Sequence, residues 1–376
     1  MQHVADAAMA GAGLPQSLED QRTRMFVRSD APSHVNTVES ASAYQAMGFE
    51  NTFDIERFKR DFRVEVQTLT EEEAVFDLIG IDAALANAFR RILLAEVPTM
   101  AIEKVFILNN TSMIQDEVLA QRLGLIPIRA DPRKFNARNA DDDADADNVI
   151  SFRLQVKCTH AAKDSSNGGG GGGGGGGSSS GGSDGVIGAS VTSGDLEWIA
   201  QGDQDERFAD DPIRPVHDDI LIARLRPGQE IELEAWCEKG LGKTHAKWSP
   251  VCTASYRLLP DIRLKEPITG DDAHKLKGMC PMDVFDVEDL GGVPTAKTAR
   301  PRNCSMCREC VRQPSWEKRV ELARVKDHFI FSVESTGSLP PEILFQEAVK
   351  VLMQKAIDIA GLLNDAVAGQ AGGGAV

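Results

Sequence analysis

The sequence predicts an α+β fold, because strand patterns and helix patterns both occur and occupy separate stretches of the chain. Residues 62–79 alternate apolar and polar positions twice around an acidic turn, which is typical of a β-hairpin. Residues 328–333 form another extended apolar run. From about residue 341 onward, apolar residues recur at intervals of four and three, the spacing of one face of a helix.

The first hundred residues predict an extension, the hairpin and a capped helix. Residues 1–52 show little periodicity, so we expect a disordered extension there. After the hairpin, Asp82 is placed to cap a helix that continues to residue 95 and stops at Val97-Pro98. The apolar side of this helix contains Leu85, Phe89 and Ile92.

Strands dominate the predicted middle of the chain. A strand at 102–108 and a helix at 114–123 come first, and Gly124 is expected to end that helix in a left-handed conformation. The acidic run 141–147 and the glycine run 167–188 predict flexible loops, because burial of a glycine run cannot offset its ordering entropy. Further strands are expected at 151–158, 229–237, 251–259 and 328–333.

The final helix carries one continuous apolar seam. Its members are spaced 4-3-4-3-4 along the chain: Phe345, Val349, Leu352, Ala356, Ile359 and Leu363. Such a seam requires a partner surface, which is either another protein or this protein's own sheet. Beyond the helix, residues 364–376 are expected to form a flexible tail.

Composition argues against a direct role in binding nucleic acid or membranes. The chain of 376 residues carries 41 Lys and Arg against 57 Asp and Glu, a net charge of −16. Phosphate binding depends on basic side chains that release counterions, so we expect protein partners instead of DNA. No apolar run approaches the ~20 residues of a membrane helix. The dispersed cysteines favour a reducing compartment.

No set of residues predicts catalysis. The segment GLGKT at 240–244 resembles part of a phosphate-binding loop, but the motif's first glycine is replaced by Cys237. The seven histidines are scattered and fall in no catalytic motif, and His328 is most simply a structural residue of its strand. We therefore expect a non-catalytic protein.

Four cysteines predict a metal site. Cys304, Cys307 and Cys310 form a C-x2-C-x2-C run, and Cys280 precedes a proline 24 positions upstream. Ferredoxins ligate an iron–sulfur cluster with such a run and a remote Cys-Pro. Four thiolates suit a [4Fe–4S] cluster or zinc. Zinc more often uses two paired C-x2-C knuckles, so the layout favours the cluster, with zinc and no metal as alternatives.

Several segments in order resemble the alpha-type assembly subunits of RNA polymerases. They are NAFRRILLAEVPTMAIE at 87–103, the continuation to residue 128, WSPVCTASYRLLP at 248–260, and the stretch from residue 325 to residue 356. The resemblance covers roughly residues 53–363. Within this family the chain is most similar to the larger alpha-like subunit shared by eukaryotic RNA polymerases I and III, and its cysteine region resembles the ferredoxin-like domain of the archaeal counterpart.

The resemblance implies a discontinuous architecture. A dimerisation domain would comprise residues 53–100, 251–262 and 324–363. An inserted, mainly β domain would span 101–250, and a small ferredoxin-like cysteine domain would span 263–323.

The resemblance also implies the partners. Family members pair with a smaller alpha-like subunit through their first and last helices, which here carry Leu85, Phe89 and Ile92 and the seam described above. The heterodimer then nucleates assembly of the second-largest and largest subunits. Arg90 and Arg91 match a family arginine pair that contacts the second-largest subunit; the alternative is an ordinary solvated helix face.

The function implied is that of a scaffold subunit in transcription of rRNA, tRNA and 5S RNA. Such a subunit would act in the nucleus, in both nucleolus and nucleoplasm. Two alternatives remain at this stage: the equivalent subunit of RNA polymerase II, and an iron–sulfur electron carrier that would rest on the four cysteines alone.

Overall fold

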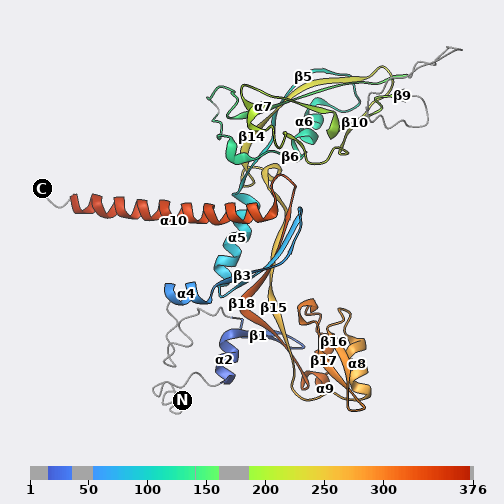
Figure 1. Ribbon diagram of the computed structural model, residues 1–376, viewed down its shortest axis with the longest axis vertical. Helices are drawn as coiled ribbons and strands as arrows, with labels where there is room; N and C mark the ends of the chain where they lie inside the picture. The colour runs from blue at the N-terminus through green and yellow to red at the C-terminus, as the bar shows by residue number, and fades with distance from the viewer. Residues whose placement is uncertain (1–15, 36–53, 140, 161–185, 373–376) are drawn as a thin grey trace. The chain divides into compact units, whose positions relative to one another are not determined.

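The computed structural model describes residues 16–35, 54–139, 141–160 and 186–372 (Figure 1). The chain divides into two compact units. The first contains the described parts of 1–69, 74–90 and 254–332, and the second contains those of 70–73, 91–253 and 333–376. Both units mix helices with antiparallel sheet, which agrees with the predicted α+β class. Among the described helices, none has the length and apolar character required to cross a bilayer.

A six-stranded sheet organises the first unit. The predicted hairpin at 62–79 is confirmed as β3 (Arg63–Leu69) and β4 (Glu73–Ile79), which pair antiparallel. The strand order is β2-β1-β18-β4-β3, and β15 also pairs with β18. The remaining strands are β1 (Arg24–Val27), β2 (Pro32–Ser33), β15 (Val251–Leu264) and β18 (Val320–Ser335).

The N-terminal extension is more ordered than we expected. Within residues 1–52, the described part forms helix α2 (Gln16–Thr23) followed by β1 and β2. Strand β1 pairs antiparallel with β18, and Val27 lies opposite Leu322. The prediction of disorder was wrong for this segment, because its stability comes from a strand some 300 residues away and not from local periodicity.

Helix α5 (Ala83–Ala95) begins where the sequence predicted it to begin. The Asp82 carboxylate accepts a hydrogen bond from the backbone N–H of Ala84 at 2.8 Å, which caps the helix. At the other end, the backbone N–H of Val97 donates to the carbonyl of Ile92, and Pro98 then starts the next strand. Gly80, with φ +80°, turns the chain from β4 toward the cap.

The cysteine-containing part of the first unit is a small module. It is built from α8 (Asp271–Met279), the hairpin of β16 (Phe285–Leu290) and β17 (Val293–Thr298), and α9 (Pro314–Glu317). Its core joins helix, hairpin and sheet residues with one residue of the N-terminal segment: Val27, Ile268, Leu276, Phe285, Cys310, Val311, Trp316 and Leu322.

A four-stranded antiparallel sheet organises the second unit. Its strand order is β11-β7-β14-β5, and α6 (Asp116–Gly124) packs on it. The strands are β5 (Pro98–Asn110), β7 (Val149–Lys157), β11 (Leu196–Ile199) and β14 (Glu230–Leu241). Short pairs complete the unit: β6 (Ile128–Arg129) with β12 (Arg214–Pro215), β8 (Thr159–His160) with β9 (Val186–Ile187), and β10 (Ser190–Thr192) with β13 (Leu221–Arg224). Nearly all of the predicted glycine loop lies outside the described residues.

Two glycines of the second unit are explained by close packing. Gly124 is the last residue of α6 and does not adopt the left-handed conformation that we predicted. Instead, a Cβ at this position would come within 3.3 Å of the Ile102 carbonyl oxygen. Gly242, in the GLGKT segment, passes so close to Leu94 that a Cβ would lie 2.4 Å from its carbonyl oxygen. The segment follows β14 as a turn, so its glycines serve packing.

The last helix, α10 (Pro341–Gly372), is longer than predicted. We expected a flexible tail from residue 364, but the helix continues to Gly372, and residues 373–376 lie outside the described residues. The added stretch contains three alanines, which favour helix, and no proline before the helix ends.

The N-terminal contribution to the core can be tested with Val27→Asp. Val27 is 9% exposed and packs in the core of the cysteine module, so a carboxylate there would be buried without a partner. We expect a loss of roughly 3 kcal/mol or more in the free energy of unfolding, measured by urea denaturation. Val35→Asp, at a position 61% exposed, should change it by less than about 0.5 kcal/mol. Equal effects of the two substitutions would contradict this role.

Candidate metal centre and partner surface

Cys280 is positioned by the end of helix α8. It is the C-terminal cap of the helix, and its backbone N–H donates to the carbonyl of Lys277. The chain then turns through Asp283, which has a φ of 51°. This turn brings the backbone N–H of Val284 to 3.5 Å from the Cys280 sulfur, which accepts its hydrogen bond.

The other three cysteines lie on a tightly curled loop. Cys304 follows a short 3-10 turn, η4 (Pro301–Asn303), and Cys310 lies within another, η5 (Glu309–Val311). Between them, Met306 and Arg308 have φ values of 59° and 67°. Left-handed conformations at two non-glycine residues carry a cost of order 1–3 kcal/mol each. The same curl places the backbone nitrogen of Met306 3.4 Å from the Cys304 sulfur, which accepts its hydrogen bond.

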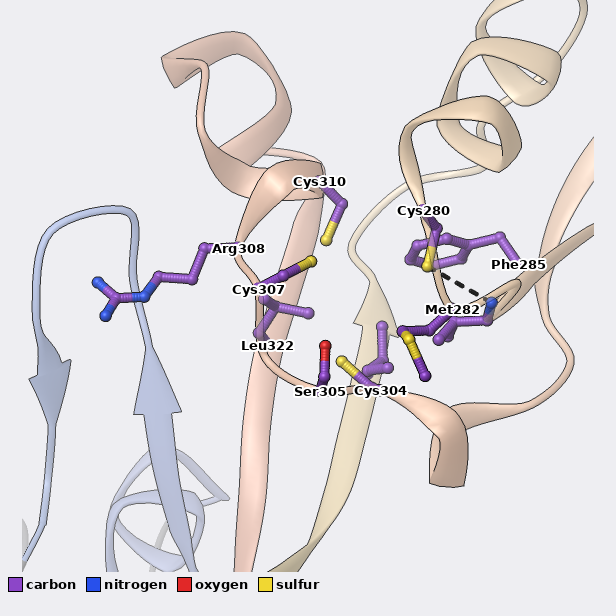
Figure 2. A pocket seen from close by; sticks show the side chains of 11 residues that line it. Cys280, Met282, Phe285, Cys304, Ser305, Cys307, Arg308, Cys310 and Leu322 are labelled. Carbon is purple, nitrogen blue, oxygen red and sulfur yellow. Dashed lines mark hydrogen bonds between the residues drawn. The ribbon is translucent and has the colours of Figure 1, made fainter.

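The four cysteines line one small pocket. Cys280 lies on one side of it, and the loop that carries the other three forms the other side (Figure 2). Apolar residues complete the lining, among them Ile262, Phe285 and Leu322. The structure therefore brings together the four residues that the sequence singled out, although 24 positions separate Cys280 from the run.

The electrostatics of the pocket disfavour four free thiolates. Burial raises the pKa of the Cys304 thiol, and neighbouring Cys280 and Cys307 raise it further, although the hydrogen bond from Met306 lowers it. Burial, together with the other three cysteines, raises the pKa of Cys310 to about 12. Each thiolate would have to form beside others in an apolar site. A bound cation would remove this penalty, so the donor set suits a metal with affinity for thiolate.

The sulfur atoms do not form a preassembled site for a single ion. In the described part of the chain, no group of three or more His, Cys, Asp or Glu side chains is arranged to hold a metal ion. Zinc requires four ligands at ~2.3 Å around one point. In a four-iron cluster, each thiolate binds a different corner of a cube, so the sulfurs stand farther apart. The shared pocket supplies four thiol groups, a donor set that suits either metal centre.

Two arginines anchor the cysteine loop to other parts of the first unit. Arg302, two residues before Cys304, binds the Asp77 carboxylate through both of its terminal nitrogens, at 2.7 and 2.6 Å. Arg308, between Cys307 and Cys310, donates to the carbonyl of Asp30 at 3.1 Å. Sequence analysis missed both anchors, because no local pattern links residues that lie 225 and 278 positions apart.

The last helix presents a series of exposed apolar side chains. Its first turns are covered, with Leu344 and Ala348 fully buried, but every residue from 353 to 366 is exposed. Of the predicted seam, Phe345 and Leu352 are half-buried, whereas Val349, Ala356, Ile359 and Leu363 are exposed. Within the described chain, only the beginning of the seam is therefore covered. Three large apolar residues that the seam omitted are exposed as well, two of them on the side of the helix away from Ile359: Met353, Ile357 and Leu362.

Helix α5 exposes fewer of its apolar residues to a partner than its sequence pattern suggested. Leu85 and Phe89 are half-buried, but Ile92 is only 3% exposed. Ile92 thus packs within the chain, and we assign it to the core instead of the interface. The periodicity of α5 could not separate these positions, because one apolar face serves both the core and the surface. Arg90 donates to the Asn87 side chain at 2.9 and 3.1 Å, and Arg91 is exposed.

Comparison with known proteins identifies the family. The model of the RNA polymerase Rpb3/Rpb11 dimerisation domain matches residues 75–356. The chain is 49% identical over 344 residues to the Bos taurus "DNA-directed RNA polymerases I and III subunit RPAC1", covering 90% of this chain and 95% of the relative. For the Dictyostelium discoideum protein of that name the identity is 44%, with 93% and 96% covered.

A relative from RNA polymerase II is less similar. The "DNA-directed RNA polymerase II subunit rpb3" of Dictyostelium discoideum is 32% identical, over 83% of this chain and 98% of the relative. Within that one organism, the polymerase I and III subunit is therefore the better match to the chain, by 44% against 32%. The chain belongs to the RPAC1 family of alpha-like subunits shared by DNA-directed RNA polymerases I and III.

Proposed function

We propose that the chain is the non-catalytic assembly subunit of RNA polymerases I and III, and that α10 is its main docking element. The exposed apolar face of α10 carries this proposal. Large apolar side chains such as Ile359 and Leu363 are 59% and 62% exposed. Burying each such side chain fully against a partner is worth about 1.5–3 kcal/mol. A helix with this exposed face is suited to pack beside a second helix.

The proposed occupant of this face is the smaller alpha-like subunit. The matched family model is a dimerisation domain, and it includes α5 and the first half of α10. In this arrangement Leu85 and Phe89 of α5 would join the α10 face in the contact. In this non-enzymatic role, the chain supplies a binding surface and no reacting group.

The resulting heterodimer would then recruit the second-largest and largest subunits. Arg91 is exposed and Arg90 is held by Asn87, so both guanidinium groups lie at the helix surface. We assign them to the contact with the second-largest subunit, in line with the family resemblance. The subunit would act in the nucleus, in nucleolar polymerase I and nucleoplasmic polymerase III.

The finer architecture follows the same proposal. The dimerisation domain would comprise 53–100, 251–262 and 324–363, interrupted by an insert domain at 101–250 and a ferredoxin-like cysteine domain at 263–323. The sheet of β5, β7, β11 and β14 falls in the proposed insert, and the module of α8, β16 and β17 falls in the proposed cysteine domain.

We further propose that Cys280, Cys304, Cys307 and Cys310 hold one [4Fe–4S] cluster. Support comes from their shared pocket, their thiolate chemistry and the layout of a C-x2-C-x2-C run with a remote Cys-Pro. When bound, the cluster would supply iron–thiolate bonds that cross-link the end of α8 to the cysteine loop. Its role would be structural, and an electron carrier is not favoured, because that reading leaves most of the chain unexplained.

The docking surface can be tested with Ile359→Glu. A glutamate in the middle of the exposed α10 face would be buried without a partner in the heterodimer, so we expect binding to weaken at least tenfold, equivalent to about 1.4 kcal/mol. The measurement is the dissociation constant for the smaller alpha-like subunit. Gln354→Glu places the same residue on the opposite side of the exposed helix and should bind normally. Unchanged binding by the Ile359 variant would rule out this face.

The metal proposal can be tested on anaerobically purified protein. We expect a broad absorbance band near ~400 nm and about four irons per chain. Cys307→Ser should abolish both signals, whereas Cys252→Ser, at an exposed cysteine outside the pocket, should leave them intact. Zinc without iron would select the alternative metal. Protein free of both metals after purification and reconstitution would refute the site.

A further inference from the structure

The Asp77 carboxylate is buried at the centre of a contact among four side chains. Asp77 lies on β4 and is 2% exposed. Arg302 binds both of its oxygens, and Nε2 of His328, on β18, lies 3.0 Å from Oδ2. Burial alone would raise the pKa of Asp77, yet hydrogen bonds from Arg302 and His328 hold it below its ordinary value. The amide of Gln67, on β3, also donates to Oδ2 at 3.4 Å. The carboxylate is therefore an anion whose partners come from three separate segments.

This contact fixes the start of the cysteine loop to the sheet. Arg302 lies in the short turn η4, immediately after Pro301 and two residues before Cys304. Its guanidinium binds Asp77 in a two-pronged geometry, which restrains orientation as well as distance. The side chain of Arg302 remains 32% exposed, so the pair lies at the border between core and surface.

Cys280 reaches the same pocket from a different direction. It is held by helix α8, whereas the Cys304 end of the loop is held by β4 through Arg302. A metal bound by both Cys280 and Cys304 requires a fixed separation between these two residues. Within the module, Arg300 ties the start of the loop to Asp283, near Cys280. The other anchor of this segment, Asp77, does not belong to the cysteine module. It belongs to the strand that leads, through Gly80 and Asp82, into helix α5.

We propose that the Asp77–Arg302 pair positions the cysteine loop for metal binding and couples occupancy of the cysteine pocket to strand β4. This inference rests on the metal site proposed above. Asp77 and Arg302 are positioning residues, since neither side chain would bind the metal itself. The coupling is reciprocal: a metal that fixes Cys304 also holds Arg302 against Asp77, and an intact pair slows loss of the metal.

The decisive variant is Arg302→Gln, compared with Arg312→Gln. Both remove one positive charge near the loop, but Arg312 is 75% exposed and pairs only with Glu309 in the contacts described. After anaerobic reconstitution with iron and sulfide, chelator is added and the band near ~400 nm is followed. We expect the cluster to be lost about tenfold faster from Arg302→Gln and at the wild-type rate from Arg312→Gln. Equal rates in all three proteins would overturn the proposal.

A second pair of variants separates positioning from general destabilisation. Arg302→Lys keeps the charge but lacks the planar fork, so its rate of cluster loss should fall between wild type and Arg302→Gln. Asp77→Asn removes the acceptor, and its combination with Arg302→Gln should lose the cluster no faster than the more affected single variant, because the two residues act as one unit. Additive effects of the two substitutions would contradict a shared role.

Hydrogen exchange distinguishes failure of this proposal from failure of the metal site. Without metal, Arg302→Gln should increase amide exchange in residues 302–310 at least threefold relative to wild type and Arg312→Gln. In loaded wild-type protein, exchange in β4 should be slower than in the metal-free form. If wild type binds no metal but loop exchange rises in Arg302→Gln, the positioning role stands and the metal site fails. If metal binds and neither exchange nor release changes, the positioning role fails.

Discussion

Strand β18 is the element on which the other parts of the first unit depend. It runs for 16 residues and pairs with β1, β4 and β15. At its start, Leu322 faces Val27 across the β1 pairing and also lines the cysteine pocket. In its middle, His328 contacts Asp77. A shift in its register by one residue would exchange its buried and exposed faces, and would disturb the N-terminal strand, the pocket and the Asp77 contact together.

The same strand also leads into α10, the helix proposed to dock a partner. After Ser335 the chain turns through Gly337, which has a φ of 87°, and α10 begins at Pro341. Hydrogen bonds from the Gly337 N–H to the Ser335 hydroxyl, and from that hydroxyl to the Leu339 carbonyl, fix the turn. The helix is thus held at one end by packed residues while its remaining turns stay exposed. Isolated helices are marginal in water, so such a helix gains most of its stability when a partner covers it.

Local patterns predicted the elements well but not the long-range contacts. The hairpin at 62–79 and the Asp82 cap depend on neighbouring residues, and the structure confirms both. Three of the four cysteines were singled out because their spacing is a local signal, and Cys280 because a proline follows it. In contrast, the β1 pairing, the Asp77–Arg302 contact and the burial of Ile92 depend on chain segments brought together by the fold. Periodicity marks an apolar face, but it does not say whether the chain itself or a partner covers that face.

The cysteine module illustrates why a scaffold subunit would use a metal at all. Its regular elements are one nine-residue helix, a hairpin of two six-residue strands and a few short turns. A core of this size buries little apolar surface, so small modules generally need a cross-link to be rigid. Three contacts from outside support the module. Val27 of the N-terminal segment packs in its core, and carbonyl groups of the same segment accept hydrogen bonds from Arg308. The Asp77 carboxylate of β4 binds Arg302. These three external supports hold the pocket from different sides, and a metal would close the remaining side between α8 and the cysteine loop. Occupancy would then set the rigidity of the module without requiring any turnover chemistry.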